Sequence, residues 1–263
     1  IVTDHHQVQK NIPSAFAIIN PNHPDCRSNY GELCGTGVAF MLCVALRKKL
    51  RETGFYHHRP VYDLKNDLDL VALATIADIV PLKKINRLLV KTGLEVLSQT
   101  KKPGLQSLIQ ESGILGEITT YHLGYLIGPR INAAGRFGKI SQALKLLLTE
   151  NHLEAMEIAL ELGKYNKERM SIQSEMTETA LKILEEKKPQ HIGIVAEERF
   201  HEGVVGIVAA KLTEKFQVPC LVFSKDHEGN FKGSGRSLPT CDLFLWLSKY
   251  NHYFLKFGGH PMA

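Results

Sequence analysis

The sequence predicts an α/β protein in two parts that are joined by a long helix. The first part opens with the apolar run Ile1-Val2, which leads into polar residues as a strand of a parallel sheet does, and continues with helical patterns. A helical pattern then runs without a break from Asn151 to about Glu186. Strand and helix patterns alternate after it, which is typical of a compact α/β module. We therefore expect a first domain at 1–150, a connector helix at 151–188 and a second domain at 189–263.

Several helices are predicted in the first part. From Gly35 to Gly54 apolar residues recur at intervals of three and four, and basic residues occupy the last turns, where the helix dipole favours cations. The stretch from Asp67 to Asp78 is apolar on nearly every side, which predicts a buried helix that stops before Pro81. Shorter helical patterns, split by Gly, Pro and Thr signals, follow at 86–97, 105–112, 121–127 and 140–148.

The long helix begins at Asn151, and Glu154 three residues later predicts a capping box. At 1.5 Å per residue, about 35 residues span about 50 Å, more than one small domain needs, so we expect a connector. The later patterns predict strand 191–196, helix 204–216, strand 219–223, a hairpin turn at 228–230, strand 231–235, helix 241–250 and strand 253–257.

Composition narrows the class of protein. Hydrophobic residues make up 44% of the 263 residues, enough for a real core. The five cysteines form no CxxC pair, which fits a reducing cytoplasm. No run approaches the roughly 18 apolar residues that a membrane span needs, so we expect a soluble, cytoplasmic protein. The net charge of +5 is compatible with a polyanionic partner, although proteins that bind nothing charged often carry such a surplus.

Asp4, His5 and His6 follow the opening apolar run, where α/β proteins keep their active sites. Imidazoles are common metal ligands, and a neighbouring carboxylate can orient one of them through its second ring N–H. The alternative is that Asp4 caps a turn and that the histidines are polar loop residues. Asp78 ends an apolar helix, where its charge opposes the dipole by about 0.3–1 kcal/mol. A bound cation would remove that penalty, and the alternative is a carboxylate that faces solvent.

A third cluster lies between Gly128 and Arg136. It sets Arg130, Asn132 and Arg136 among small residues that let a ligand approach the backbone. Guanidinium groups match phosphate oxygens with two parallel hydrogen bonds. The alternative is an ordinary loop with two solvated arginines.

The second part offers three weaker signals. The stretch 201–211 predicts a strand-to-helix turn whose glycines suit a phosphate at the helix N-terminus. Ser234 and Arg236 stand on a strand edge, and the glycines of 258–260 permit a close backbone approach. Each signal is ordinary alone, and their order along one chain is what makes them informative.

Together these residues resemble the DHH phosphoesterase superfamily and, within it, the RecJ family of single-strand-specific exonucleases. Asp4-His5-His6 is similar to the signature that names the superfamily, and 77–82 to its fourth motif. The turn at 258–260 resembles the start of the glycine-His motif of the DHHA1 domain. The stretches 128–136 and 201–209 single out the RecJ family. The resemblance implies the later part of a DHH parallel-sheet domain, joined by the connector helix to a smaller α/β DHHA1 domain.

The resemblance also implies roles for individual residues. His5 and Asp78 would bind a divalent metal, Mn²⁺ or Mg²⁺, His6 would contact the scissile phosphate, and Asp4 would orient a ligand. The residues implied in binding phosphates and the terminal nucleotide are Arg130, Asn132, Arg136, Ser234, Arg236, Gly258, Gly259 and His260. The implied activity is two-metal hydrolysis of single-stranded DNA from its 5′ end in DNA repair and recombination. A single-strand-binding protein and a RecQ-type helicase are the further candidate partners.

The chain departs from the family pattern at both ends. The first two family motifs, which supply further aspartate ligands, are absent, and the glycine-His motif breaks off early. We therefore expect a core fragment, truncated at both ends, that is inactive or nearly so alone. Phe200 stands where the family commonly has Trp. Two other functions remain open: a DHH-type oligoribonuclease or nucleotide phosphodiesterase, and a catalytically dead nucleic-acid-binding scaffold.

Overall fold

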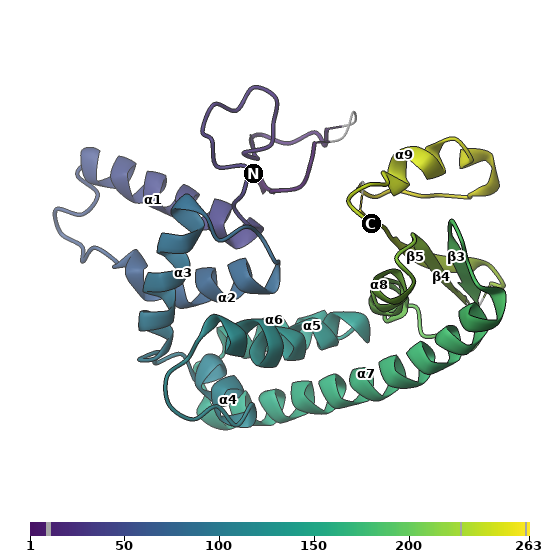
Figure 1. Cartoon of the computed structure of the whole chain (residues 1–263). Coiled ribbons are helices and arrows are strands. Elements are labelled where there is room, and N and C mark those ends of the chain that lie inside the picture. Colours follow the sequence, from purple (N-terminus) through teal and green to yellow (C-terminus); the bar gives the residue numbers. More distant parts are fainter. Residues whose placement is uncertain (9–11, 227, 261) are drawn as a thin grey trace. The chain divides into compact units, whose positions relative to one another are not determined.

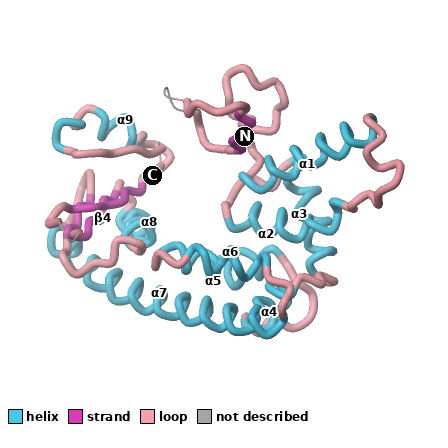
Figure 2. Tube along the Cα trace, turned by 180° about the vertical axis from the view of Figure 1, so that it is seen from behind, coloured by secondary structure: helices cyan, strands magenta, loops and turns pink. Residues whose placement is uncertain are grey.

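The computed structural model describes residues 1–8, 12–226, 228–260 and 262–263. These residues form two compact units, unit 1 (Ile1–Gly135 and Lys139–Gly163) and unit 2 (Arg136–Gly138 and Lys164–Ala263). Helix α7, His152–Lys187, has 36 residues and runs from unit 1 into unit 2. The fold is mixed α/β, as predicted, with many helices and two small sheets (Figure 2).

The sheet of unit 1 is a pair of very short parallel strands. Strand β1 (Val2–Thr3) was predicted, and it pairs with β2 (Ile18–Ile19), which was not predicted. The partner thus follows β1 in the chain. Because the strands are parallel, the polar residues after each of them, beginning with Asp4 and Asn20, lie at the same edge of the sheet.

Three helices of unit 1 pack together: α1 (Gly35–Glu52), α2 (Leu68–Ala77) and α3 (Lys84–Leu97), which lie side by side in Figure 1. Helix α2 follows a 3-10 turn at Leu64–Asp67 and is buried on most sides, as its composition predicts. Gly93 of α3 lies against its first turns. The core here comprises Leu33, Val38, Leu68, Val71 and Leu89.

One charged residue of α2 is fully buried. The Asp69 carboxylate accepts hydrogen bonds from Lys102 Nζ at 2.9 and 3.0 Å and from the Thr100 hydroxyl at 2.8 Å. A buried charge is tolerated when it is paired and hydrogen-bonded, so this contact fixes the segment before α4 (Pro103–Glu111) against α2.

The rest of unit 1 is helical. The pattern at 121–127 forms a π-helix, η2 (His122–Ile127), which runs directly into α5 (Gly128–Arg136), and α6 (Ile140–Leu148) follows as predicted. The arginine-containing stretch is therefore a helix and not a loop. Gly124 and Gly128 bring this segment close to the end of α2, because a Cβ at either position would lie 3.3 Å from Ile76 or Ala77.

The start of α7 is capped as predicted, but the capping box does not form. The Asn151 side-chain oxygen accepts from the backbone N–H groups of Leu153 at 2.9 Å and Glu154 at 3.2 Å. The Glu154 carboxylate contacts Lys145 Nζ at 2.7 Å and the Thr149 hydroxyl instead. A lysine one turn from the end of α6 thus competes successfully for the carboxylate. Within the described ranges no helix combines the length and the apolar composition of a membrane span.

Unit 2 is a small α/β module built on a three-stranded sheet (Figure 1). Its elements after α7 are β3 (Gly193–Ala196), α8 (Val205–Phe216), β4 (Cys220–Lys225), β5 (Phe231–Arg236), α9 (Leu243–Ser248) and a 3-10 turn (Asn251–Tyr253). Strand β4 lies in the middle, parallel to β3 and antiparallel to β5 through the predicted hairpin. The core includes Met176 and Leu184 of α7 with Val195, Val208 and Val222.

The prediction of a strand at 253–257 is wrong. Its first residue ends the 3-10 turn, and the following residues form bends. Tyr253 and Leu255 are 77% and 91% exposed, so their alternation with other residues does not mark a buried sheet face. Phe257 packs instead against the rings of Phe244 and Phe254.

Replacing Gly93 by alanine tests the close approach of α3 to α2. A methyl group there would overlap the Leu68 carbonyl oxygen and lie 2.5 Å from Ala72 Cβ. We expect Gly93→Ala to lower the free energy of unfolding by about 2 kcal/mol in urea denaturation. Helix propensity alone predicts a gain of about 1 kcal/mol. The control is Gly135→Ala in α5, whose added methyl would meet only Ile140 at an ordinary 3.6 Å. A stabilised Gly93→Ala variant would contradict the packing.

Candidate functional site

Two candidate metal ligands lie close together, His5 after β1 and Asp78 at the end of α2. His5 Nε2 lies 3.4 Å from Asp78 Oδ2, although the two residues are far apart in the sequence. The imidazole also packs on the first residue of α1, since a Cβ on Gly35 would lie 3.5 Å from its ring. The His5 side chain is 19% exposed and that of Asp78 42% exposed, so the pair is accessible from one side.

The donor atoms fit a divalent cation. Neighbouring ligands of an octahedral Mg²⁺ ion, each at about 2.1 Å, are about 3 Å apart, close to the separation of His5 Nε2 and Asp78 Oδ2. Ligand atoms of Asp4, His5 and His6 also lie within 4.8 Å of one another. An imidazole nitrogen with carboxylate oxygens is a donor set that suits Mn²⁺, and the carboxylates also suit Mg²⁺.

Asp4 orients the second histidine. Its Oδ1 lies 2.7 Å from His6 Nδ1 and accepts from the backbone N–H of His5 at 2.7 Å. Burial acts to raise the pKa of the Asp4 carboxyl, but hydrogen bonds from the His6 ring and from the backbone of His5 and His6 outweigh it, so the pKa is lowered. The carboxylate therefore stays ionised and holds the His6 ring, whose Nε2 is left for another partner.

Two asparagines that sequence reasoning missed hold this loop. Asn20 Nδ2 donates to the His6 carbonyl at 2.9 Å, and Asn22 Nδ2 donates to the His5 carbonyl at 2.7 Å. Both asparagines follow β2, at the edge where β1 ends. The signal for them is the run Ile18-Ile19 followed by polar residues, which repeats the pattern of the opening run.

Asp78 is held by the turn that follows it. Ile79 has a φ of 57°, in the left-handed region that a β-branched residue rarely adopts, and such backbone strain costs about 1–3 kcal/mol. Beyond it, the buried Asn86 donates to the carbonyls of Pro81 at 3.0 Å and Glu32 at 2.6 Å. The turn is thus tied both to α3 and to the segment before α1.

Arg130 and Asn132, predicted to bind phosphate, lie in different surroundings on α5. Arg130 Nε contacts the Glu111 carboxylate and its Nη1 donates to the Leu126 carbonyl at 2.7 Å. The side chains of Arg130 and Glu111 are only 13% and 12% exposed. Gly163 of α7 packs so closely on Glu111 that no Cβ fits there. Asn132 is exposed.

The other predicted phosphate-binding residues lie in unit 2. Arg236 Nη1 donates to the Ser234 hydroxyl oxygen at 2.9 Å and to the Gly235 carbonyl at 2.6 Å. A Cβ on Gly206, in the first turn of α8, would lie 3.1 Å from both Arg236 Nη2 and Ser234 Oγ. Arg136 Nη1 donates to the Gly203 carbonyl at 2.7 Å. Strand β5, the loop before α8 and Arg136 therefore converge.

Both arginines of this group are partly desolvated. Burial lowers the pKa of the Arg236 guanidinium, and burial followed by repulsion from Arg236 lowers that of Arg136. An arginine stays protonated despite such shifts, so both guanidinium groups carry a positive charge. A third arginine, Arg169 of α7, lies close enough to Arg136 for their charges to repel each other. Burial lowers the pKa of Arg169 as well, followed by repulsion from Arg136.

The predicted glycine-His turn lies beside the same strand. The Ser237 N–H, just after β5, donates to the Met262 carbonyl at 3.0 Å. Ala263 N–H donates to the His260 carbonyl at 3.1 Å, and the carbonyl of Ala263 leaves no room for a Cβ on Gly259. Gly258, Gly259 and His260 are exposed.

Comparison with known proteins gives a consistent result. Residues 188–263 match the DHHA1 domain family. The chain is 41% identical over its whole length to the single-stranded-DNA-specific exonuclease RecJ of Bacillus subtilis (strain 168), of which it covers 32%. It is 40% identical to the protein of the same name from Salmonella typhimurium, of which it covers 48%. The chain thus spans about a third to a half of the length of these curated relatives.

Two solved structures match nearly the whole length of the chain. The crystal structure of RecJ in complex with Mn²⁺ from Thermus thermophilus matches with a TM-score of 0.84 and 33% identity, over 99% of this chain and 37% of that one. The structure of exonuclease RecJ bound to manganese matches with a TM-score of 0.78 and 31% identity, over 99% of this chain and 62% of the other.

The DHHA1 match thus agrees with the small α/β module observed in unit 2. The relatives that match it from end to end carry one name in common. The chain is thus similar along its whole length to RecJ exonucleases. The Thermus thermophilus relative has also been solved with Mg²⁺.

Asp78→Asn tests whether the His5–Asp78 pair binds metal. The amide keeps an oxygen donor but loses the charge, so we expect Mn²⁺ to bind at least tenfold more weakly. Mn²⁺ binding to the chain is measured by electron paramagnetic resonance of the free ion. The control is Asp25→Asn, which alters an exposed carboxylate 3.7 Å from His23 and should leave binding unchanged. Equal effects of the two substitutions would contradict the assignment.

Proposed function

We propose that this chain contributes the metal-binding and phosphate-binding residues of an exonuclease that hydrolyses single-stranded DNA in the 5′ to 3′ direction. The observation that carries the proposal is the convergence of His5 and Asp78 in a chain similar along its whole length to exonucleases of that name. A role in DNA repair and recombination, a cytoplasmic location, and a single-strand-binding protein and a RecQ-type helicase as partners belong to the same proposal.

In unit 1, His5 and Asp78 are the proposed ligands of a divalent metal, Mn²⁺ or Mg²⁺. Bound metal ions supply an activated water and stabilise charge on the attacking and leaving oxygens of an in-line displacement. His6, whose ring Asp4 orients, is the proposed hydrogen-bond donor to the scissile phosphate. Asn20 and Asn22 keep the backbone of the two histidines in place.

In unit 2, the proposed ligand is the 5′ phosphate and its nucleotide. Arg136 and Arg236 supply charge, and Ser234 supplies a hydroxyl beside the glycine-containing start of α8. The exposed segment Gly258–His260 offers backbone for the terminal nucleotide.

Arg130 and Asn132 differ in how accessible they are to a phosphate. The exposed amide of Asn132 is free to reach a phosphate, as the sequence suggests. Arg130 is engaged by Glu111, and a phosphate contact would have to replace this ion pair. We therefore propose that Arg130 acts mainly by fixing α5 against α4.

The two other functions are less well supported. A dead scaffold has no need to keep an accessible imidazole and carboxylate 3.4 Å apart. An oligoribonuclease is disfavoured by the whole-length similarity to exonucleases named for single-stranded DNA. Degradation of long single-stranded DNA, compared with short RNA, separates these possibilities.

Arg236→Gln tests the phosphate-binding residues directly. The chain should bind a 5′-phosphorylated oligothymidylate more tightly than the same strand with a 5′ hydroxyl, as measured by fluorescence anisotropy. Loss of one charge-assisted contact should weaken binding of the phosphorylated strand about tenfold and remove most of this preference. Arg87→Gln, in an exposed arginine of α3, is the control. A preference retained in Arg236→Gln would contradict the proposal.

The chain by itself should release few or no mononucleotides from phosphorylated single-stranded DNA in Mn²⁺. Two ions need several ligands each, and the described residues bring only His5 and Asp78, with Asp4 and His6 nearby, to the site. Release of radiolabelled nucleotide is the measurement. Clear activity that His5→Ala abolishes would contradict this expectation.

A further inference from the structure

Arg169 of α7 has an unusual set of contacts. Its Nη1 donates to Gln173 Oε1 at 2.7 Å and its Nη2 donates to Asn166 Oδ1 at 2.9 Å. Its Nε is buried and has no hydrogen-bond partner among the described residues. A guanidinium carries five N–H donors, so most of its capacity is unused. A buried N–H group without a hydrogen-bond partner lowers the stability of the fold by about 1–3 kcal/mol.

The two amides hold the guanidinium but do not neutralise it. The ion pairs identified between described residues pair carboxylates with lysines, histidines and Arg130. The acceptors of all three arginines are amide, carbonyl and hydroxyl oxygens. Structural arginines are ordinarily paired with carboxylates, as Arg130 is with Glu111.

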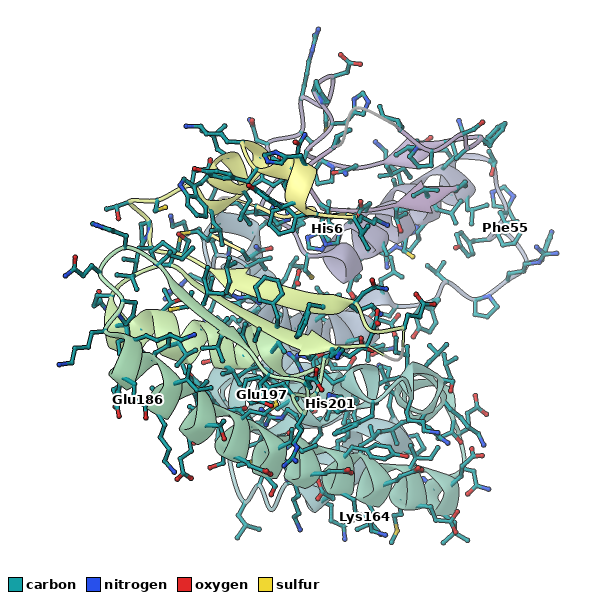
Figure 3. The ribbon with its side chains drawn as sticks, turned by 90° about the vertical axis from the view of Figure 1, so that its right-hand side faces the viewer. His6, Phe55, Lys164, Glu186, Glu197 and His201 are labelled. Carbon is teal, nitrogen blue, oxygen red and sulfur yellow. The ribbon has the colours of Figure 1, made fainter. Side chains whose placement is uncertain are left out.

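Several contacts bring this part of α7 to the loop before α8. Phe137 lies between Tyr165 of α7 and His201, with ring centroids 5.9 and 5.2 Å apart. The His201 N–H donates to Met176 Sδ of α7 at 3.4 Å. In Figure 3, Lys164 and Glu186 lie near the two ends of the unit 2 part of α7, and His201 lies over the helix between them.

We propose that Arg169 is a third guanidinium of the phosphate site of unit 2, held by Asn166 and Gln173 so that its free N–H groups meet an anion together with Arg136 and Arg236. This inference rests on the proposed function and adds a residue that neither the sequence motifs nor the resemblance assigns. The site has three fixed positive charges and no carboxylate among the ion pairs of the described residues, so the bound phosphate supplies the missing counter-charge. Positive charge held in this way favours a terminal phosphate monoester, which carries more than one negative charge, over an internal diester.

The test is binding of 5′-phosphorylated oligothymidylate to the 263-residue chain at several salt concentrations, with the 5′-hydroxyl strand as reference. Arg169→Gln should weaken binding of the phosphorylated strand about tenfold and leave the hydroxyl strand nearly unchanged. The slope of log Kd against log salt should fall by about 0.7, because one fewer counter-ion equivalent is displaced. Lys167→Gln, in an exposed lysine of the same helix, is the control and should change neither quantity.

Two further variants separate charge from packing. Arg169→Lys keeps the charge and should keep the salt slope, while its affinity stays below wild type because an ammonium cannot use both amides. Gln173→Ala keeps the guanidinium of Arg169 but removes one of the two amides that hold it. The affinity for the phosphorylated strand should therefore fall, while the slope of log Kd against log salt stays unchanged. These variants also keep the proposal testable if Arg169→Gln does not fold, which circular dichroism detects.

Outcomes that overturn this inference differ from those that overturn the proposed function. If Arg169→Gln binds both strands as wild type does while Arg236→Gln loses the phosphorylated strand, Arg169 is only structural and the proposed function stands. If the wild-type chain does not prefer the phosphorylated strand at all, the proposed function fails and the inference fails with it.

Discussion

Helix α2 can be apolar on nearly every side only because three other segments of unit 1 cover it. Gly93 lets α3 approach its first turns, Cys34 Sγ at the start of α1 lies 3.5 Å from the hydroxyl of Thr75, and Gly128 brings α5 to its end. A helix packed on so many sides has a single position along its axis. That position fixes Asp78 beside His5, so the candidate metal centre depends on the helix packing.

The helices were predictable because their apolar periodicity is local and strong. Strand β2 was not predicted: it has two residues, and its existence depends on pairing with Val2 and Thr3, which no local pattern encodes. The aromatic run at 253–257 was predicted as a strand because apolar and other residues alternate along it. Such alternation indicates a sheet only where one face is buried, and here the alternating residues are exposed. The arginine-containing helix α5 looked irregular because its small residues, among them Gly128, serve close packing against α2.

The sequence predicted the residues of the candidate site as separate groups. It did not predict which of these residues lie close together in space. Periodicity cannot show that His5 and Asp78 lie 3.4 Å apart, because that contact follows from how β1, α1 and α2 pack. Supporting residues such as Asn22 were missed for a related reason. An asparagine after an apolar run is ordinary in any loop, and only the carbonyl that it contacts, that of His5, shows what it does.

The arginines show how surroundings assign different roles to one side chain. Arg130 and Arg136 lie in one motif on one helix, yet Arg130 is paired with a carboxylate, whereas Arg136 donates to a carbonyl. A paired guanidinium is already neutralised, so it stabilises the fold whether or not a ligand is present. Arg136 and Arg236 repel each other in the free protein. If the proposed phosphate binds there, it removes that repulsion, so stability and phosphate binding would be linked in unit 2.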